Sequence, residues 1–145
     1  MNVARPILLV ENEENDVVFL KRAMQKAGII NPVHVVESGQ DAVAYLKGER
    51  EYANRAVHPL PMLVLLDLKL RGLDGADVLA WLRQQRAFAT LPVIVLSSSA
   101  LPIDVDEAYR RGANSYVLKT AEPAELAELM QAFALWWLKH NICPL

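Results

Sequence analysis

The sequence has little cysteine and no long apolar run. Its one cysteine, Cys143, excludes an internal disulfide and any metal site built from several thiolates. No stretch approaches the roughly 20 apolar residues that cross a membrane, and no cationic start followed by an apolar segment marks a secretion signal. These absences predict a cytoplasmic protein that does not interact with a membrane.

The sequence also has no large excess of charge of either sign. The 15 basic and 17 acidic residues are interspersed along the chain and leave a net charge of -2. Because lysine and arginine form no basic cluster, the sequence predicts no binding to nucleic acid or to a membrane surface. The 145 residues suit one domain, which would bury about two-thirds of its unfolded surface. We therefore expect a single domain over residues 1–145 whose partners are proteins.

What the sequence does contain is a regular alternation of apolar runs and helix-forming segments. The runs, each typical of a strand, are residues 7–10, 33–36, 62–66, 93–96 and 116–118. The helix-forming segments are residues 15–27, 40–47, 76–85, 103–111 and 123–139. Such alternation predicts one parallel sheet covered on both faces, a doubly wound α/β fold. The one long connection, residues 48–61, is polar and is expected to be a surface loop.

Polar residues stand at the ends of four of these runs, where a buried strand has no need of them. They are Glu11-Asn12-Glu13-Glu14, Asp67, Ser97-Ser98-Ser99 and Lys119. The carboxyl ends of parallel strands share one edge of a sheet, so these groups are expected to meet there. A carboxylate nucleophile, oxygen ligands, a hydroxyl and an ammonium suit the capture of a phosphoryl group with a hard cation such as Mg²⁺.

Four segments together resemble the receiver domain of two-component response regulators, the CheY-like family. They are LLVENEEND, LVLLDLKLRGLDG, VIVLSSS and GANSYVLKT, in the family's order and at its usual spacing. The resemblance implies a flavodoxin-like sheet of order 2-1-3-4-5 with five helices. It also implies a signalling protein rather than an enzyme, with self-phosphorylation and self-dephosphorylation at most. The long loop, the SSS run, the KT ending and the C-terminal helix are most similar to single-domain receivers paired with bacterial phytochrome histidine kinases.

The resemblance also implies a phosphoacceptor and a metal site. Asp67 takes the place of the phosphoacceptor, with Glu11, Asn12 and the backbone carbonyl of Lys69 as further ligands of Mg²⁺. The family most often has Asp where Asn12 stands, and an amide oxygen brings no charge, so we expect weaker metal binding, with Glu13 as the candidate to compensate. The side chain of Lys69 follows the acceptor closely, and we hypothesise that it tunes the lifetime of the acyl phosphate.

Three further residues gain a role from the same resemblance. Ser97 is the expected switch hydroxyl, and Lys119 is the cation that pairs with the phosphoryl group. Tyr116 is the expected aromatic switch, although it could equally be a strand aromatic packed on a helix. The family usually has proline where Thr120 stands. Because a cis bond before a non-proline residue costs about 2.5–4 kcal/mol, we expect a trans bond or a rare strained one.

Other classes of protein fit less well. A phosphatase of the haloacid-dehalogenase type also uses an Asp nucleophile at a strand end, but it needs a second Asp where this chain has Lys69. Nucleotide and flavin modules lack support, since neither G-x-G-x-x-G nor a Walker motif is present. The serious alternative is a degenerate receiver that acts as a phosphate-independent interaction module, which Asn12 favours.

The last predicted helix carries apolar residues on more than one side. At about 100° per residue, one face would dock on the sheet through Leu126, Leu129, Met130, Phe133 and Trp137. Residues 136–145 are expected to form an extended helix end and tail. There Leu135, Leu138 and Ile142 fall on roughly the opposite face, with Trp136 at one side, and this surface predicts a two-fold homodimer. The alternative is a tail that folds back over its own domain.

Overall fold

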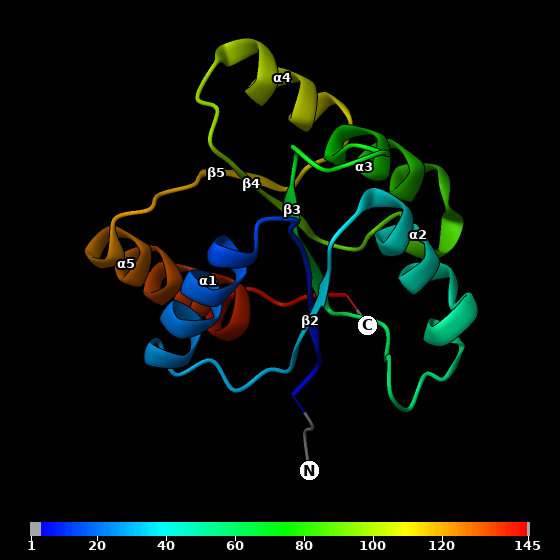
Figure 1. Ribbon diagram of the computed structural model, residues 1–145, viewed down its shortest axis with the longest axis horizontal. Coiled ribbons are helices and arrows are strands. Elements are labelled where there is room, and N and C mark those ends of the chain that lie inside the picture. Colours follow the sequence, from blue (N-terminus) through cyan, green and yellow to red (C-terminus); the bar gives the residue numbers. More distant parts are fainter. Residues whose placement is uncertain (1–3, 145) are drawn as a thin grey trace.

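The computed structural model describes residues 4–144, in which five strands alternate with five α-helices (Figure 1). The strands are β1 (Ile7–Val10), β2 (Val33–Val36), β3 (Leu63–Asp67), β4 (Val93–Ser97) and β5 (Ser115–Leu118). The α-helices are α1 (Glu14–Lys26), α2 (Gly39–Lys47), α3 (Gly75–Gln84), α4 (Pro102–Arg110) and α5 (Pro123–Phe133). Three short segments complete the chain: the 3₁₀ turns η1 (Arg50–Ala53) and η2 (Arg86–Phe88), and the π-helix η3 (Ala134–His140).

All neighbouring strands of the sheet pair in parallel, in the order β2-β1-β3-β4-β5. This confirms the predicted doubly wound α/β fold and its strand order. Every residue of β1, β3 and β4 is buried, as expected for apolar strands covered on both faces, whereas the edge strands β2 and β5 are partly exposed. No helix within residues 4–144 is long and apolar enough to cross a membrane.

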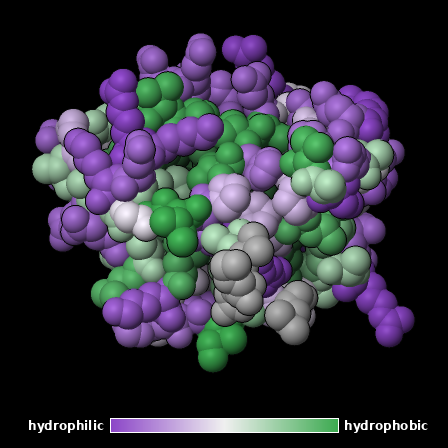
Figure 2. Space-filling model, turned by 90° about the horizontal axis from the view of Figure 1, so that it is seen from below, coloured by the Kyte–Doolittle hydropathy of each residue, from purple (hydrophilic) through white to green (hydrophobic). Residues whose placement is uncertain are grey.

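Helices cover both faces of the sheet, so the core has two halves. Figure 1 shows α1 and α5 on one side, and α2 and α3 on the other. Successive residues of β1 point to opposite halves: Leu8 and Val10 belong to the cluster under α2 and α3, whereas Ile7 and Leu9 belong to the cluster under α1 and α5. Seen from below, the surface has separate hydrophobic groups among hydrophilic ones (Figure 2).

The start of α3 is built to lie directly against the end of β3. The Asp74 side chain accepts a hydrogen bond from the Asp77 backbone N–H at 3.0 Å and so caps the helix. The next residue is Gly75, whose backbone N–H donates to the Leu68 carbonyl at 3.0 Å. A Cβ atom at position 75 would collide with the carbonyl oxygen of Asp67. Glycine therefore allows α3 to approach the strand end that carries Asp67.

The long connection after α2 lies at the surface but is packed rather than loose. Arg55 donates to the backbone carbonyls of Tyr45 and Leu46, both at 2.7 Å, and so satisfies the last turn of α2. The Tyr45 hydroxyl in turn donates to the Pro59 carbonyl at 2.8 Å. The ring of His58 lies edge-on to that of Tyr45, with 5.7 Å between centroids. The residues of this loop thus hold it against α2.

The end of the last helix differs from the prediction. The predicted docking face is confirmed, since Leu126, Leu129, Met130, Phe133 and Trp137 all pack in the cluster under α1 and α5. Leu138, however, was expected on the opposite face and packs against the same cluster. The reason is η3, in which the Asn141 N–H donates to the Trp136 carbonyl five residues earlier. A π-helix has more residues per turn than an α-helix, so the rule of 100° per residue fails there.

The other apolar residues of this segment remain at the surface. Leu135, Trp136 and Ile142 are 51%, 60% and 93% exposed. The tail beyond them folds back in part, because Cys143 packs against the core cluster and the Arg5 guanidinium donates to the Pro144 carbonyl at 2.8 Å. The predicted alternative of a tail folded over its own domain therefore holds for part of this segment.

Candidate functional site

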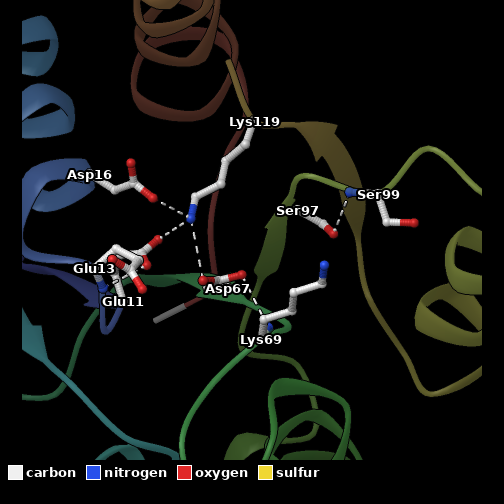
Figure 3. A network of polar contacts seen from close by, with 8 residues as sticks. All are labelled: Glu11, Glu13, Asp16, Asp67, Lys69, Ser97, Ser99 and Lys119. Atoms are coloured by element: carbon white, nitrogen blue, oxygen red, sulfur yellow. Dashed lines mark hydrogen bonds and ion pairs between the residues drawn. The ribbon is translucent and has the colours of Figure 1, made fainter. Parts of the chain in front are cut away.

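The polar residues predicted to meet do lie at one edge of the sheet (Figure 3). Asp67 is the last residue of β3 and Ser97 the last of β4, while Glu11 and Lys119 directly follow β1 and β5. The side chains of Glu11, Asp67 and Ser97 are buried among the strand ends. The Lys119 backbone N–H donates to the Ser97 carbonyl at 2.7 Å, which extends the pairing of β4 and β5 by one bond. The strand ends thus fix four functional groups relative to one another.

The ammonium group of Lys119 lies at the centre of the site. Its Nζ atom is 2.6 Å from Glu11 Oε2, 2.8 Å from Asp16 Oδ2 and 3.3 Å from Asp67 Oδ2 (Figure 3). The contacts with Asp16 and Asp67 have hydrogen-bond geometry, whereas the contact with Glu11 is a close ion pair. One cation therefore offsets the charge of three anionic groups.

Burial and these ion pairs change the acidity of both partners. Burial raises the pKa of Glu11 from 4.5 to about 7; hydrogen bonds from Lys119 and from the Glu13 N–H act against it, while the charge of Asp67 adds to it. Burial acts to lower the pKa of Lys119, but hydrogen bonds to Asp16 and Glu11 and the charge of Asp67 outweigh it and raise that pKa. Lys119 is therefore a permanent cation at neutral pH, whereas the charge of Glu11 depends on what lies beside it.

Lys69, two residues after Asp67, contacts the other carboxylate oxygen of Asp67. The backbone N–H of Lys69 donates to Asp67 Oδ1 at 3.1 Å. The two oxygens of Asp67 thus have different partners, a backbone amide and an ammonium. The side chain of Lys69 extends beside Asp67 on the side of Ser97 (Figure 3).

The loop after β4 connects the predicted switch residues. Ser97 Oγ accepts a hydrogen bond from the Ser99 N–H at 3.1 Å, and the Tyr116 hydroxyl donates to the Ser99 carbonyl at 2.7 Å. The Ser99 hydroxyl donates to Asp104 in the first turn of α4. Tyr116 therefore does not touch Asp67 but reaches the loop that follows Ser97. Ser99 joins this loop to α4.

The oxygen atoms near Asp67 fit a hard cation. Asn12 Oδ1 is buried and has no hydrogen-bond partner among the described residues, which is the state of an oxygen that can accept a further ligand. Glu11 and Asp67 supply carboxylate oxygens at the same edge of the sheet. No three side chains of His, Cys, Asp and Glu within residues 4–144 form a ready metal cage, so a cation here would need amide, carbonyl and water oxygens as well. Mg²⁺ commonly binds in that way, with few carboxylates and several waters.

Thr120 stands where the family usually has proline, in the short link between β5 and α5. The bond between Lys119 and Thr120 is trans, as are all peptide bonds in the described part of the chain. The Thr120 hydroxyl accepts from the Glu122 N–H at 3.1 Å and donates to Glu125 at 2.8 Å. Thr120 therefore helps to start α5 without a cis bond.

Asp16 is the site residue that sequence reasoning missed. It lies in the first turn of α1, and its carboxylate reaches Lys119 from the side opposite to Ser97 (Figure 3). The sequence does place Asp16 shortly after β1, at the same edge of the sheet as Glu11. Nothing in the spacing alone says that this carboxylate faces Lys119 rather than solvent.

Known proteins share both this sequence pattern and this structure. The family model described as response regulator receiver domain matches residues 7–131. The chain is 32% identical to the response regulator Rcp1 of Synechocystis sp.. The match spans 143 residues, which are 99% of this chain and 95% of Rcp1. A crystal structure of Rcp1 in its Mn²⁺-bound form is also similar, with a TM-score of 0.88, 31% identity, and coverage of 97% of this chain and 99% of that one.

Two further crystal structures are similar over nearly their whole length. One is the phosphorylated cyanobacterial phytochrome response regulator RcpA, with a TM-score of 0.90 and 32% identity over 99% of this chain and 100% of that one. The other is the response regulator RPA3017 in red light signaling of R. palustris, with a TM-score of 0.92 and 31% identity over 97% of this chain and 99% of that one.

Proposed function

This chain belongs to the response regulator receiver domain family, and we propose that it accepts a phosphoryl group on Asp67 from a sensor histidine kinase. The observation that carries this proposal is the position of Asp67, a buried carboxylate at a strand end with Lys119 Nζ 3.3 Å from one oxygen and the Lys69 N–H 3.1 Å from the other. In the transfer, a carboxylate oxygen would bond to phosphorus as the N–P bond of a phosphohistidine breaks, and the histidine nitrogen would keep the electron pair.

The neighbouring groups suit a phosphoryl group on Asp67. Lys119 would offset its negative charge, and the Ser97 hydroxyl would donate a hydrogen bond to one of its oxygens. Since Ser97 also accepts from the Ser99 N–H, a turn of its hydroxyl toward a phosphoryl oxygen would change the loop to which Tyr116 is bonded. The output is then a change in protein binding rather than turnover of a metabolite.

We infer that Mg²⁺ assists this reaction. Glu11, Asp67, the side-chain oxygen of Asn12 and the backbone carbonyl of Lys69 would hold the cation. When bound, the cation offsets charge on the transferring phosphoryl group. Rcp1, a relative of this chain, has been solved with Mn²⁺, which takes the same kinds of oxygen ligand.

The kinase is proposed to be a bacterial phytochrome. RcpA is described as a phytochrome response regulator, and RPA3017 as a response regulator in red light signaling. In this proposal the chain works in the cytoplasm as a stand-alone receiver. It would also form a homodimer through the exposed apolar residues at the end of the last helix, Leu135, Trp136 and Ile142.

One experiment separates this function from a degenerate receiver. The protein and its Asp67→Asn variant are incubated with acetyl phosphate and Mg²⁺, and the intact masses are measured. We expect the wild type alone to gain the mass of one phosphoryl group. No gain in either protein would favour a phosphate-independent interaction module, the alternative raised by Asn12. Steady release of phosphate by the wild type over many turnovers would instead favour a phosphatase.

A further inference from the structure

The Asp16 carboxylate has no role in the proposed transfer, yet it is one of the two closest partners of Lys119. The distance from Lys119 Nζ to Asp16 Oδ2 is 2.8 Å, shorter than the 3.3 Å to Asp67 Oδ2. Asp16 and Lys119 also line a cavity of about 220 Å³ between α1 and α5, together with Phe19 and Leu126. The ammonium is thus drawn toward this cavity and away from the acceptor.

Phosphorylation changes the competition for the ammonium. A phosphoryl group on Asp67 carries about two negative charges and three strong acceptor oxygens, whereas the single ammonium of Lys119 already forms ion pairs with three carboxylates. A phosphoryl group on Asp67 therefore competes with Glu11 and Asp16 for this ammonium.

The two other carboxylates differ in what their release would cost. The Glu11 side chain is 1% exposed, so losing its cation would leave a buried carboxylate with the Glu13 N–H as its remaining hydrogen-bond donor. The Asp16 side chain is 39% exposed and lines an open cavity, so water can replace the ammonium at little cost. Asp16 is the partner that Lys119 can leave most easily.

We propose that Asp16 is a positioning residue that restrains Lys119 in the unphosphorylated protein and releases it to the phosphoryl group on Asp67. This inference rests on the proposed function. Asp16 favours the unphosphorylated state in two ways, because it holds the ammonium and because its negative charge repels an incoming phosphoryl donor. Both effects lower the phosphorylated fraction. The carboxylate of Asp16 thereby sets how much of the protein is phosphorylated at a given supply of phosphoryl donor.

The test measures the phosphorylated fraction in matched variants. Wild type, Asp16→Asn, Asp16→Glu and Glu14→Gln are incubated with subsaturating acetyl phosphate and Mg²⁺, and the ratio of phosphorylated to unphosphorylated protein is read from intact mass. Glu14 lies in the same turn of α1, is exposed and forms no ion pair with any residue in 4–144, so it controls for charge alone.

We expect Asp16→Asn to raise this ratio by a factor of about two to five, the range that corresponds to an exposed ion pair. Asp16→Glu keeps the charge and the pairing and is expected to behave as the wild type, as is Glu14→Gln. A ratio in Asp16→Asn equal to or below that of the wild type would overturn the inference. So would an equal rise in Glu14→Gln.

A second measurement needs no phosphoryl transfer and so separates this inference from the proposed function. Each protein is treated briefly with acetic anhydride at pH 8, and modification of Lys119 is followed by peptide mass. Release from Asp16 is expected to increase the rate at Lys119 about two- to five-fold in Asp16→Asn only. If no protein accepts a phosphoryl group but this rate rises, the proposed function fails and the restraint on Lys119 stands. An unchanged rate means that Asp16 does not restrain Lys119.

Discussion

At the scale of single residues, the balance of charge around Asp67 differs from what the family leads one to expect. Asn12 stands where the family most often has Asp, which removes one negative charge next to the metal ligands. Asp16 places a negative charge 2.8 Å from Lys119, on the ammonium side of the site. Metal binding and phosphoryl binding are affected by different residues, and substitutions can test them separately.

The side chain of Lys69 provides a prediction at this scale. It extends beside Asp67, where it can shield an acyl phosphate from water or bind one of its oxygens. We expect Lys69→Ala to speed the loss of the phosphoryl group by a factor of about three to ten, the effect of one ordinary hydrogen bond of roughly 0.7–1.4 kcal/mol. The decay of the phosphorylated protein after removal of acetyl phosphate measures this rate. Lys69→Arg keeps the charge and serves as the control; an unchanged decay in Lys69→Ala would remove any such role.

The residues at strand ends could be predicted, whereas their partners in helices and loops could not. Asp67, Ser97 and Lys119 follow apolar runs, and the parallel sheet then dictates that they share an edge. The position of Asp16 depends on the rotation of α1 and on the path of a long lysine side chain. The bond between Ser99 and Asp104 likewise depends on the shape of a loop. The periodicity of the strands predicts neither the position of Asp16 nor the bond between Ser99 and Asp104.

At the scale of elements, one arginine ties the end of α3 to the beginnings of two strands. Arg83 donates to the Gly112 carbonyl at 2.8 Å and to the Leu91 carbonyl at 2.8 Å, just before β5 and β4 respectively. It also donates to Asn114 Oδ1 at 2.9 Å, and that oxygen accepts from the Val93 N–H as well. A single side chain thus satisfies the turns at the edge of the sheet opposite to Asp67.

Replacement of this arginine is expected to lower stability without touching the site. Arg83→Met keeps an unbranched stem but leaves several partly buried carbonyls without a donor, and we expect a loss of about 2–3 kcal/mol in the free energy of unfolding. Urea denaturation followed by circular dichroism measures this loss as a lower midpoint with an unchanged slope. Arg86→Met, at an exposed arginine three residues later, is the control. Equal midpoints for the two variants would show that the Arg83 hydrogen bonds add nothing.

The strands and α-helices were predicted to within one or two residues, except at the end of the last helix, whereas the two 3₁₀ turns were not predicted. Apolar runs and their punctuation mark strands and ordinary α-helices well, because both have a fixed periodicity. The segment from Ala134 to His140 forms a π-helix, so the predicted placement of Leu138 on the outer face was wrong. A π-helical turn depends on how the aromatic side chains pack on the sheet, and sequence periodicity carries no signal for it.

At the scale of the whole molecule, the exposed apolar residues near the C-terminal end are the main candidate for self-association. Leu135 and Trp136 lie on the outside of η3, and Ile142 follows it. A two-fold interface uses the same residues of both copies, so one short apolar segment can bury the exposed apolar surface of each copy. Tryptophan often supplies much of the binding energy in such contacts.

A double substitution tests this assembly. We expect the wild type to be a dimer at micromolar concentration and Leu135→Ala combined with Trp136→Ala to shift it to a monomer, as measured by light scattering during size-exclusion chromatography. Ile30→Ala, at a residue that is exposed but distant in sequence, controls for general loss of apolar surface. A monomeric wild type, or a double variant that remains a dimer, would rule out this interface.

The hydrogen bond between the Lys119 backbone N–H and the Ser97 carbonyl has a consequence for how a signal leaves the site. It continues the pairing of β4 and β5 by one bond, so we expect phosphorylation to change the rotamers of Ser97 and Lys119 more than the spacing of their backbones. We therefore expect the larger displacement in the loop from Ser99 to α4. The residues that bind the phosphoryl group are then distinct from those that contact a partner. Substitutions on α4 can therefore change the choice of partner without changing phosphoryl binding.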